Sequence, residues 1–245
     1  MTKHHHRFDL ESANGRAGSL YPDMIESPQL RWAFIRKVYC IVSLQILITA
    51  GVSAAVNFVP PIRQFFHSNT PGSLAVFILL IILPLLVMIP MIYFQESHPI
   101  NLLLLGLFTV CISFAIGLAC ISTSGKVILE AAVLTFAVVV GLTLYTFWAA
   151  KRGHDFNFLG PFLFASLLVL VMFCILQIFI PMGKITKTIY GCLAAIVFSG
   201  YIIYDTDNLI KRHTYDQYVA AAISLYLDIV NLFMALLTAF SASDS

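Results

Sequence analysis

Two carboxylates lie inside hydrophobic segments near the end of the chain, whose other charges fall mostly between such segments. Asp205 lies near the end of one segment, and Asp228 lies within the next. Burying an ionisable side chain in an apolar segment that is long enough to cross a membrane is costly, so such a group marks a functional site by default. Two buried carboxyl groups within hydrogen-bonding reach do not both ionise easily, because desolvation and mutual repulsion oppose the second charge. We therefore expect them to share a proton near neutral pH.

A shared proton would tie the two segments together. Its loss, or its replacement by a cation, would leave two charges that separate the helices or coordinate a hard ion such as Ca²⁺, which prefers carboxylate and carbonyl oxygens. The pair Asp205 and Asp228 is therefore a candidate pH-dependent latch, a candidate calcium site, or both. The alternative is a static hydrogen bond, or two half-exposed acids near the membrane surface.

Further polar side chains accompany each aspartate at helical spacing. Positions i, i+4 and i+7 of a helix lie on one face. The short connection 211–217 makes the two segments antiparallel neighbours, so we expect their polar stripes to face each other. The stripes are Tyr201, Asp205 and Asn208 on the first segment, and Ser224, Asp228 and Asn231 on the second.

Two other acids are candidates for an ion path. Glu130 stands in the first turn of its segment, four residues after Lys126, where the helix dipole and an i, i+4 partner favour a carboxylate. A structural ion pair on the lumenal side is the alternative. Asp207 is four residues before Lys211, and a plain surface ion pair is the alternative there.

The sequence does not support a metal site built from cysteines or histidines, a redox site or nucleic-acid binding. The five cysteines are dispersed through apolar segments without Cys-x-x-Cys spacing, so we predict packing cysteines and no resident cofactor, with calcium only as a permeant or bound ion. The chain has no nucleotide-binding or nucleophile motif, which argues against an enzyme. The net charge of +2 does not indicate nucleic acid.

Composition predicts the elements that must position these residues. The 245 residues are 60% hydrophobic and only 11% charged, which is typical of a membrane protein. Breaks at charged, proline and glycine residues leave seven apolar stretches of about 20 residues, the length that a spanning helix needs. We predict an all-α, seven-helix bundle over residues 33–240 in contact with membrane lipid, with a flexible tail at 1–32 and a short tail at 241–245. The predicted spans are 38–59, 74–94, 100–122, 127–150, 159–181, 188–210 and 218–240.

Lysines and arginines are unevenly divided between the two sides of this topology. The positive-inside rule places the richer side, which includes the N-terminus, in the cytosol and the C-terminus outside it. The richer side has Lys3, Arg7, Arg16, Arg31, Arg36, Lys37, Lys151, Arg152, Lys211 and Arg212, and the other has Arg63, Lys126, Lys184 and Lys187.

Six ordered motifs resemble the transmembrane Bax inhibitor motif family, most closely its Lifeguard branch. The resemblance implies a seven-helix bundle of the endoplasmic reticulum, Golgi or vacuole that leaks stored calcium in a pH-dependent way and restrains cell death. It also implies that Asp205 and Asp228 form the pH-sensing pair that closes the pore. The motifs are Arg31–Tyr39 leading into Gln45, Ser97–Asn101, Val127–Ala132, Phe158–Phe162, Tyr204–Thr206 and Ser224–Phe233.

The chain departs from that family at two places. Bacterial members carry arginines at the cytosolic end of the second span, one of which pairs with the acid of the sixth helix. This chain has Phe94-Gln-Glu-Ser-His98 there, and His98 is a candidate substitute. Many relatives have glutamine where this chain has Asp207.

Three functions compete. The first is a calcium leak channel or a regulator of calcium stores. The second is a non-conducting scaffold that acts through cell-death regulators or other channels. The third, an intramembrane aspartyl protease, requires Gly-x-Gly-Asp at the second acid, and this chain has Tyr226-Leu-Asp228 without the glycines that permit close backbone approach.

Overall fold

Helices account for the regular structure of the part of the chain that the computed structural model describes, residues 27–68, 70–95, 97–180 and 183–244. Seven of these helices are long and apolar enough to cross a membrane, which confirms the predicted all-α, multi-span fold. They are α2 (Pro28–Phe58), α4 (Pro71–Phe94), α5 (Ile100–Cys120), α6 (Gly125–Lys151), α7 (Leu159–Phe179), α8 (Lys184–Lys211) and α9 (Tyr218–Asp244). Two short elements join them, α3 (Pro60–His67) and the 3-10 turn η1 (Tyr215–Gln217).

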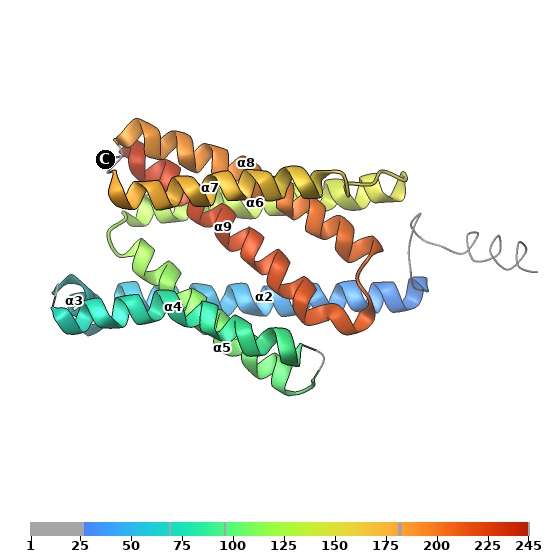
Figure 1. The fold of residues 1–245 in the computed structure, drawn as a ribbon, viewed down its shortest axis with the longest axis horizontal. Helices are drawn as coiled ribbons and strands as arrows, with labels where there is room; N and C mark the ends of the chain where they lie inside the picture. The colour runs from blue at the N-terminus through green and yellow to red at the C-terminus, as the bar shows by residue number, and fades with distance from the viewer. Residues whose placement is uncertain (1–26, 69, 96, 181–182, 245) are drawn as a thin grey trace, which may run out of the picture.

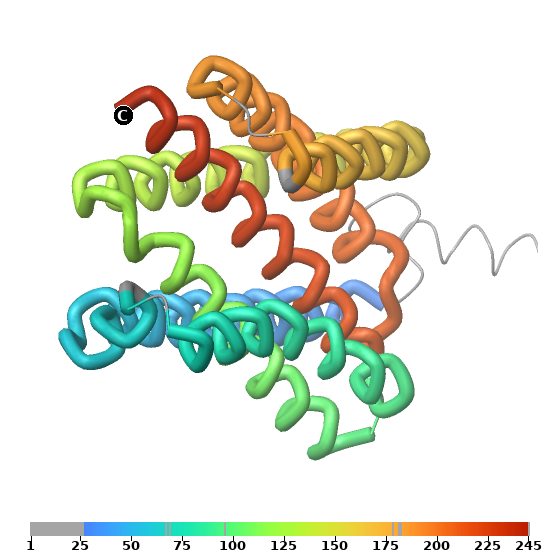
Figure 2. The backbone as a smooth tube through the Cα atoms, turned by 60° about the vertical axis from the view of Figure 1, so that its left-hand side comes forward, coloured from blue at the N-terminus to red at the C-terminus, as the bar shows by residue number. Residues whose placement is uncertain are grey.

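Helix α9 is the centre of the bundle. It runs diagonally between α2, α4 and α5 on one side and α6, α7 and α8 on the other (Figures 1 and 2). It packs against α8, α6, α2 and α5, and half of its apolar window is buried, a larger share than in the other six spans. We call the end of the bundle that contains Pro28, Lys151 and Lys211 the proximal end, and the end that contains α3 and Asp244 the distal end (Figure 1).

The first helix begins ten residues before the predicted span. Pro28 occupies its first turn, where a missing N–H has no cost, and a buried face follows at helical spacing through Arg31, Phe34 and Val38. The helix is about 46 Å long at 1.5 Å per residue, so it exceeds the hydrocarbon thickness of a bilayer. The predicted tail 1–32 was therefore too long at its end, and its residues 1–26 lie outside the described part of the chain.

Two other boundaries also differ from the prediction. Helix α9 continues to Asp244, so residues 241–244 are helical and not a separate tail. Helix α3 was not predicted at all. Pro60 and Pro61 end the backbone hydrogen bonding of α2 but fit the first turn of a new helix. The eight residues of α3 form one apolar face and one polar face.

Glycines fix two features that position the candidate site. Gly153 adopts φ 84°, a left-handed conformation that ends α6 and turns the chain into the loop before α7. Gly191 allows close approach of α8 to α9, because a Cβ at this position would lie 2.7 Å from both the Ala235 carbonyl oxygen and the Ala239 nitrogen. The close approach at Gly191 makes α8 and α9 a tightly packed antiparallel pair.

Candidate functional site

The two aspartates meet across the α8–α9 interface. Asp205 of α8 and Asp228 of α9 lie within hydrogen-bonding range of each other, and Asp228 is only 6% exposed. An ionised carboxylate is only an acceptor, so two carboxyl groups form a hydrogen bond when one of them carries a proton. The geometry therefore suits a pair that shares one proton.

The polar stripe of α8 lies beside this pair. Asn208 is a hydrogen-bond partner of Asp205, and the Tyr201 side chain is close enough to interact with the charges of both aspartates. On α9, Ser224 and Asn231 are half-buried, but the described contacts do not join them to either carboxyl group. The structure thus brings Tyr201 and Asn208 of the α8 stripe to the pair.

A histidine at the end of α8 is the basic side chain that interacts with Asp205. His213 lies in the loop between α8 and η1, and its ring bonds Gln217 at 3.2 Å. Burial lowers the pKa of His213 below its ordinary value, although the hydrogen bond with Gln217 and the charge of Asp205 act in the opposite direction. His98, the substitute suggested from the sequence, is instead exposed in the loop after α4.

Arg31 is a second basic residue that sequence reasoning did not place at the site. Its side chain is fully buried and donates to the carbonyl oxygens of Leu209, at 3.2 Å, and His213. These carbonyls lie at the C-terminus of α8, where helices leave acceptors unpaired and favour positive charge. Arg31 therefore fixes the start of α2 to the end of the helix that carries Asp205. The signal that could have identified Arg31 was its position in the first motif of the chain.

Asp207 faces a different part of the protein from Asp205. It is fully buried, and its carboxylate contacts Lys211 Nζ at 2.7 Å, Arg212 Nη1 at 3.0 Å and the backbone N–H of Phe156 at 3.2 Å. Lys211 is 1% exposed and also donates to the carbonyl of His154. The pairing with Lys211 that the sequence suggested as the alternative is present. The pair is buried and does not lie on the surface, because the α6–α7 loop covers it.

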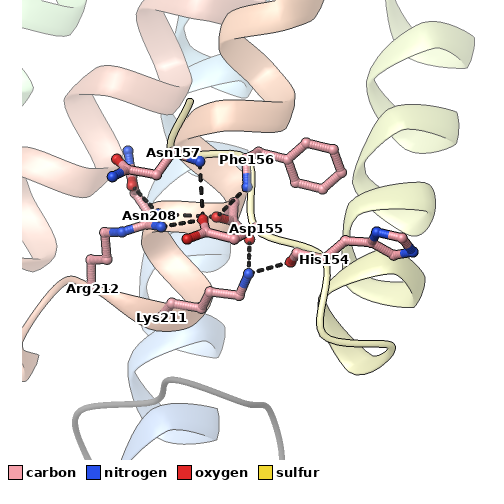
Figure 3. Close-up of polar contacts among 8 residues, drawn as sticks. His154, Asp155, Phe156, Asn157, Asn208, Lys211 and Arg212 are labelled. Atoms are coloured by element: carbon pink, nitrogen blue, oxygen red, sulfur yellow. Dashed lines mark hydrogen bonds and ion pairs between the residues drawn. The ribbon is translucent and has the colours of Figure 1, made fainter. Parts of the chain in front are cut away.

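Asp155 extends this cluster to the surface of the proximal end. Its carboxylate forms an ion pair with Arg212 and accepts the N–H of Asn157 at 3.0 Å (Figure 3). Partial burial acts to raise the pKa of Asp155, but the bonds from Arg212 and Asn157 lower it to about 2. We name Asp155, Asp207, Lys211 and Arg212 the proximal charge cluster. It fastens the α6–α7 loop to the end of α8.

Glu130 lies far from the aspartate pair. It is in the first turns of α6 at the distal end and pairs with Lys126 at 3.8 Å, with both side chains more than half exposed. This is the exposed i, i+4 pair that the sequence suggested as the alternative to an ion path.

Sequence reasoning missed a polar seam between α2 and α5. Polar residues recur at every fourth position of α2 from Gln45 to Asn57, and at Thr109 and Ser113 of α5. This spacing was the signal that could have revealed the seam. Four hydrogen bonds form it: Gln45 Nε2 to Thr109 Oγ1 (3.0 Å), Ser113 Oγ to Thr49 Oγ1 (3.1 Å), Ser53 Oγ to the Ser113 carbonyl (3.0 Å), and Asn57 Nδ2 to the Gly117 carbonyl (3.0 Å). Thr49 also bonds the Tyr226 hydroxyl at 2.8 Å, so the seam reaches α9 two residues before Asp228.

The pair supplies only part of a calcium coordination shell. Calcium takes six to eight oxygen ligands. Asp205 and Asp228 offer four carboxylate oxygens at most, and within the described residues no group of three histidine, cysteine or acidic side chains is arranged to hold a metal. A calcium ion at this position would complete its shell with water or carbonyl oxygens, which suits transient occupancy better than tight binding.

Comparison with known proteins gives a consistent assignment. A family model described as inhibitor of apoptosis-promoting Bax1 matches residues 31–245. The Arabidopsis thaliana proteins LIFEGUARD 4 and LIFEGUARD 2 are 62% and 61% identical to this chain, and each match covers 96% or more of both proteins. A Golgi anti-apoptotic protein of vaccinia virus is 35% identical over 89% of both chains. The chain belongs to the Bax inhibitor family, in the group that includes the Lifeguard proteins.

Proposed function

We propose that this protein is a pH-sensitive calcium leak channel, or a regulator of calcium stores, in an endomembrane, and that it restrains cell death. The observation that carries the proposal is the contact between Asp205 and Asp228, two acidic side chains within hydrogen-bonding range on adjacent membrane-spanning helices. The description of the family and the name of the vaccinia relative support the cell-death part.

The proposed gate is the α8–α9 interface. In the closed state one proton between Asp205 and Asp228 joins the helices. When that proton leaves, two like charges remain in a poorly solvated place, and their repulsion favours a state in which the helices separate or water and a cation enter. Because α9 packs against four other helices, a shift of α9 reaches both halves of the bundle. We therefore expect calcium flux to rise as pH rises through the titration of the pair.

The orientation is also part of the proposal. Most lysines and arginines are at the proximal end or in the N-terminal segment, so the positive-inside rule directs the proximal end, with the N-terminus, to the cytosol. The aspartate pair would then lie in the cytosolic half of the membrane and respond to cytosolic pH. The Golgi location in the name of a relative supports an endomembrane.

Flux through purified protein in liposomes tests the channel. Vesicles that contain a calcium-sensitive dye and the full chain should admit calcium at a rate that depends on pH. Asp228→Asn should give a low flux that no longer varies with pH, because an amide can still hydrogen-bond Asp205 but cannot repel it as a charge does. Glu130→Gln is the matched control and should behave as the wild type, since Glu130 is exposed and at the opposite end. Equal pH dependence in the wild type and Asp228→Asn would contradict the latch.

The same vesicles distinguish the channel from the scaffold. If wild-type vesicles pass no calcium at any pH, while expression of the chain still protects cells from death, the protein acts through cell-death regulators or other channels. A channel predicts instead that protection and a lowered calcium content of the store are lost together in Asp228→Asn.

A further inference from the structure

A cavity of about 520 Å³ lies between α2, α6 and α9, with the end of α5 at its distal side. Its floor is α9, which contributes Tyr226, Ile229 and Phe233, and its walls are α2 and α6.

Aromatic side chains join α2 and α6 on the proximal side of this space, outside its lining. The ring of Phe147 on α6 stacks on Trp32 of α2, with ring centres 6.3 Å apart and planes within 4°, and lies 6.4 Å from the ring of Tyr39. Beyond these contacts the cavity extends along α2 from Ile46 to Phe58, about 18 Å at 1.5 Å per residue. It is therefore long and narrow, parallel to the spanning helices.

The lining of the cavity is almost entirely apolar. Its polar side chains already have partners in the protein: Thr49 and Tyr226 bond each other, and Thr135 donates to the carbonyl of Ala131. Water needs two or more polar partners to occupy a cavity, and this one offers few. Leu129 and Phe136 on the α6 wall are 64% and 72% exposed, so the cavity is open on a side that faces membrane hydrocarbon.

An exposed ion pair lies beside the distal end of the cavity. Gly125 lines its distal end, and the next residue, Lys126, is 79% exposed at the start of α6. Lys126 pairs with Glu130 at 3.8 Å, but an exposed pair of this kind is weak, so the lysine can also reach a lipid phosphate at the membrane surface. A long apolar slot that opens to hydrocarbon and has a lysine at its distal end matches one class of ligand, a phospholipid of the distal leaflet.

We propose that this cavity, which we call the groove, binds one acyl chain of a phospholipid, and that the phosphate of the lipid lies near Lys126. The groove holds the chain against α9, and Tyr226 in its floor is two residues from Asp228. A bound acyl chain therefore contacts the same part of α9 as the aspartate pair. An effect of the lipid on the gate rests on the proposed function, but the binding of the lipid does not.

Lipid retention by the full chain tests the site without any flux measurement. Native mass spectrometry of detergent-purified protein with added phosphatidylcholine should detect one tightly retained lipid. Ala132→Trp and Ala50→Trp place an indole in the groove from opposite walls, at residues that the fold leaves exposed. Each should weaken binding at least about tenfold, since the loss of two buried methylene groups suffices for that factor. Lys126→Gln should also weaken retention.

Matched variants separate specific binding from general lipid adhesion. Ala137→Trp is on the same helix, exposed and outside the groove, and should retain lipid as the wild type does. Lys187→Gln removes a different exposed lysine of the distal end and should also have no effect. Equal retention by the wild type, Ala132→Trp and Ala50→Trp overturns the proposal, as does an equal loss in Ala137→Trp. Loss of lipid binding in the groove variants with intact pH-dependent flux would refute only the link to the gate.

Discussion

Asp205 and Asp207 lie two residues apart on α8, so their side chains leave the helix about 200° apart around its axis. Asp207 contacts two cations and a backbone N–H. Asp205 interacts with another carboxyl group, with the Asn208 amide and with the His213 side chain. The same residue type therefore forms a structural ion cluster on one face and a candidate proton-sharing pair on the other.

Loss of the Asp207 charge should destabilise the protein strongly. Asp207→Asn would leave Lys211 buried without its counter-charge, which costs about 3–5 kcal/mol in comparable buried pairs. Glu130→Gln breaks an exposed pair and should cost at most about 1 kcal/mol. Thermal unfolding in detergent measures both. The double variant Asp207→Asn with Lys211→Met should recover part of the loss, and a cost for Asp207→Asn no larger than that of Glu130→Gln would contradict the structure of the cluster.

His213 should make stability depend on pH in the mildly acidic range. Because burial lowers its folded pKa below the ordinary value of 6.5, the unfolded chain takes up a proton first as pH falls. The wild type should therefore lose stability below about pH 6.5 relative to His213→Gln, which has no such titration. Unfolding midpoints of the two proteins across this range give the comparison. A difference that is constant with pH would show that the imidazole is not held in its neutral form.

The packing of α8 against α9 depends on Gly191. The backbone of α9 occupies the space that a side chain would need there, so even alanine must push α8 and α9 apart. Gly191→Ala should destabilise the protein by about 1–3 kcal/mol, as overpacking does in well-packed cores. At Gly141 on α6 a Cβ meets nothing within 4 Å, so Gly141→Ala should be neutral or should stabilise by up to about 1 kcal/mol through helix propensity. Similar effects of the two substitutions would argue against the close α8–α9 contact.

Sequence patterns predicted the spans well, because an apolar run of fixed length is a strong local signal. They predicted the neighbouring positions of Asp205 and Asp228 because a short connection forces antiparallel packing. The first ten residues of α2 were missed, since that part of the helix alternates apolar and charged residues and lies beyond the apolar run. The burial of Asp207 was missed because it depends on a loop more than 50 residues away in sequence.

At the scale of the whole molecule, α9 connects the features that bear on function. It carries Asp228, its Tyr226 hydroxyl bonds the α2–α5 seam, and it forms the floor of the groove. The proximal charge cluster and Arg31 both fix the end of α8, the helix that carries Asp205. The aspartate pair is thus the contact between a helix held at its proximal end and a central helix in contact with both halves of the bundle.

A double-mutant cycle on the pH dependence of calcium flux tests the central claim, that Asp205 and Asp228 titrate as one unit. The flux of the wild type, Asp205→Asn, Asp228→Asn and the double variant should be measured in the same liposomes over the same pH series. If the two carboxyl groups share one proton, each single substitution removes the pH dependence and the double variant adds no further change. Independent, additive effects of the two substitutions would contradict the account.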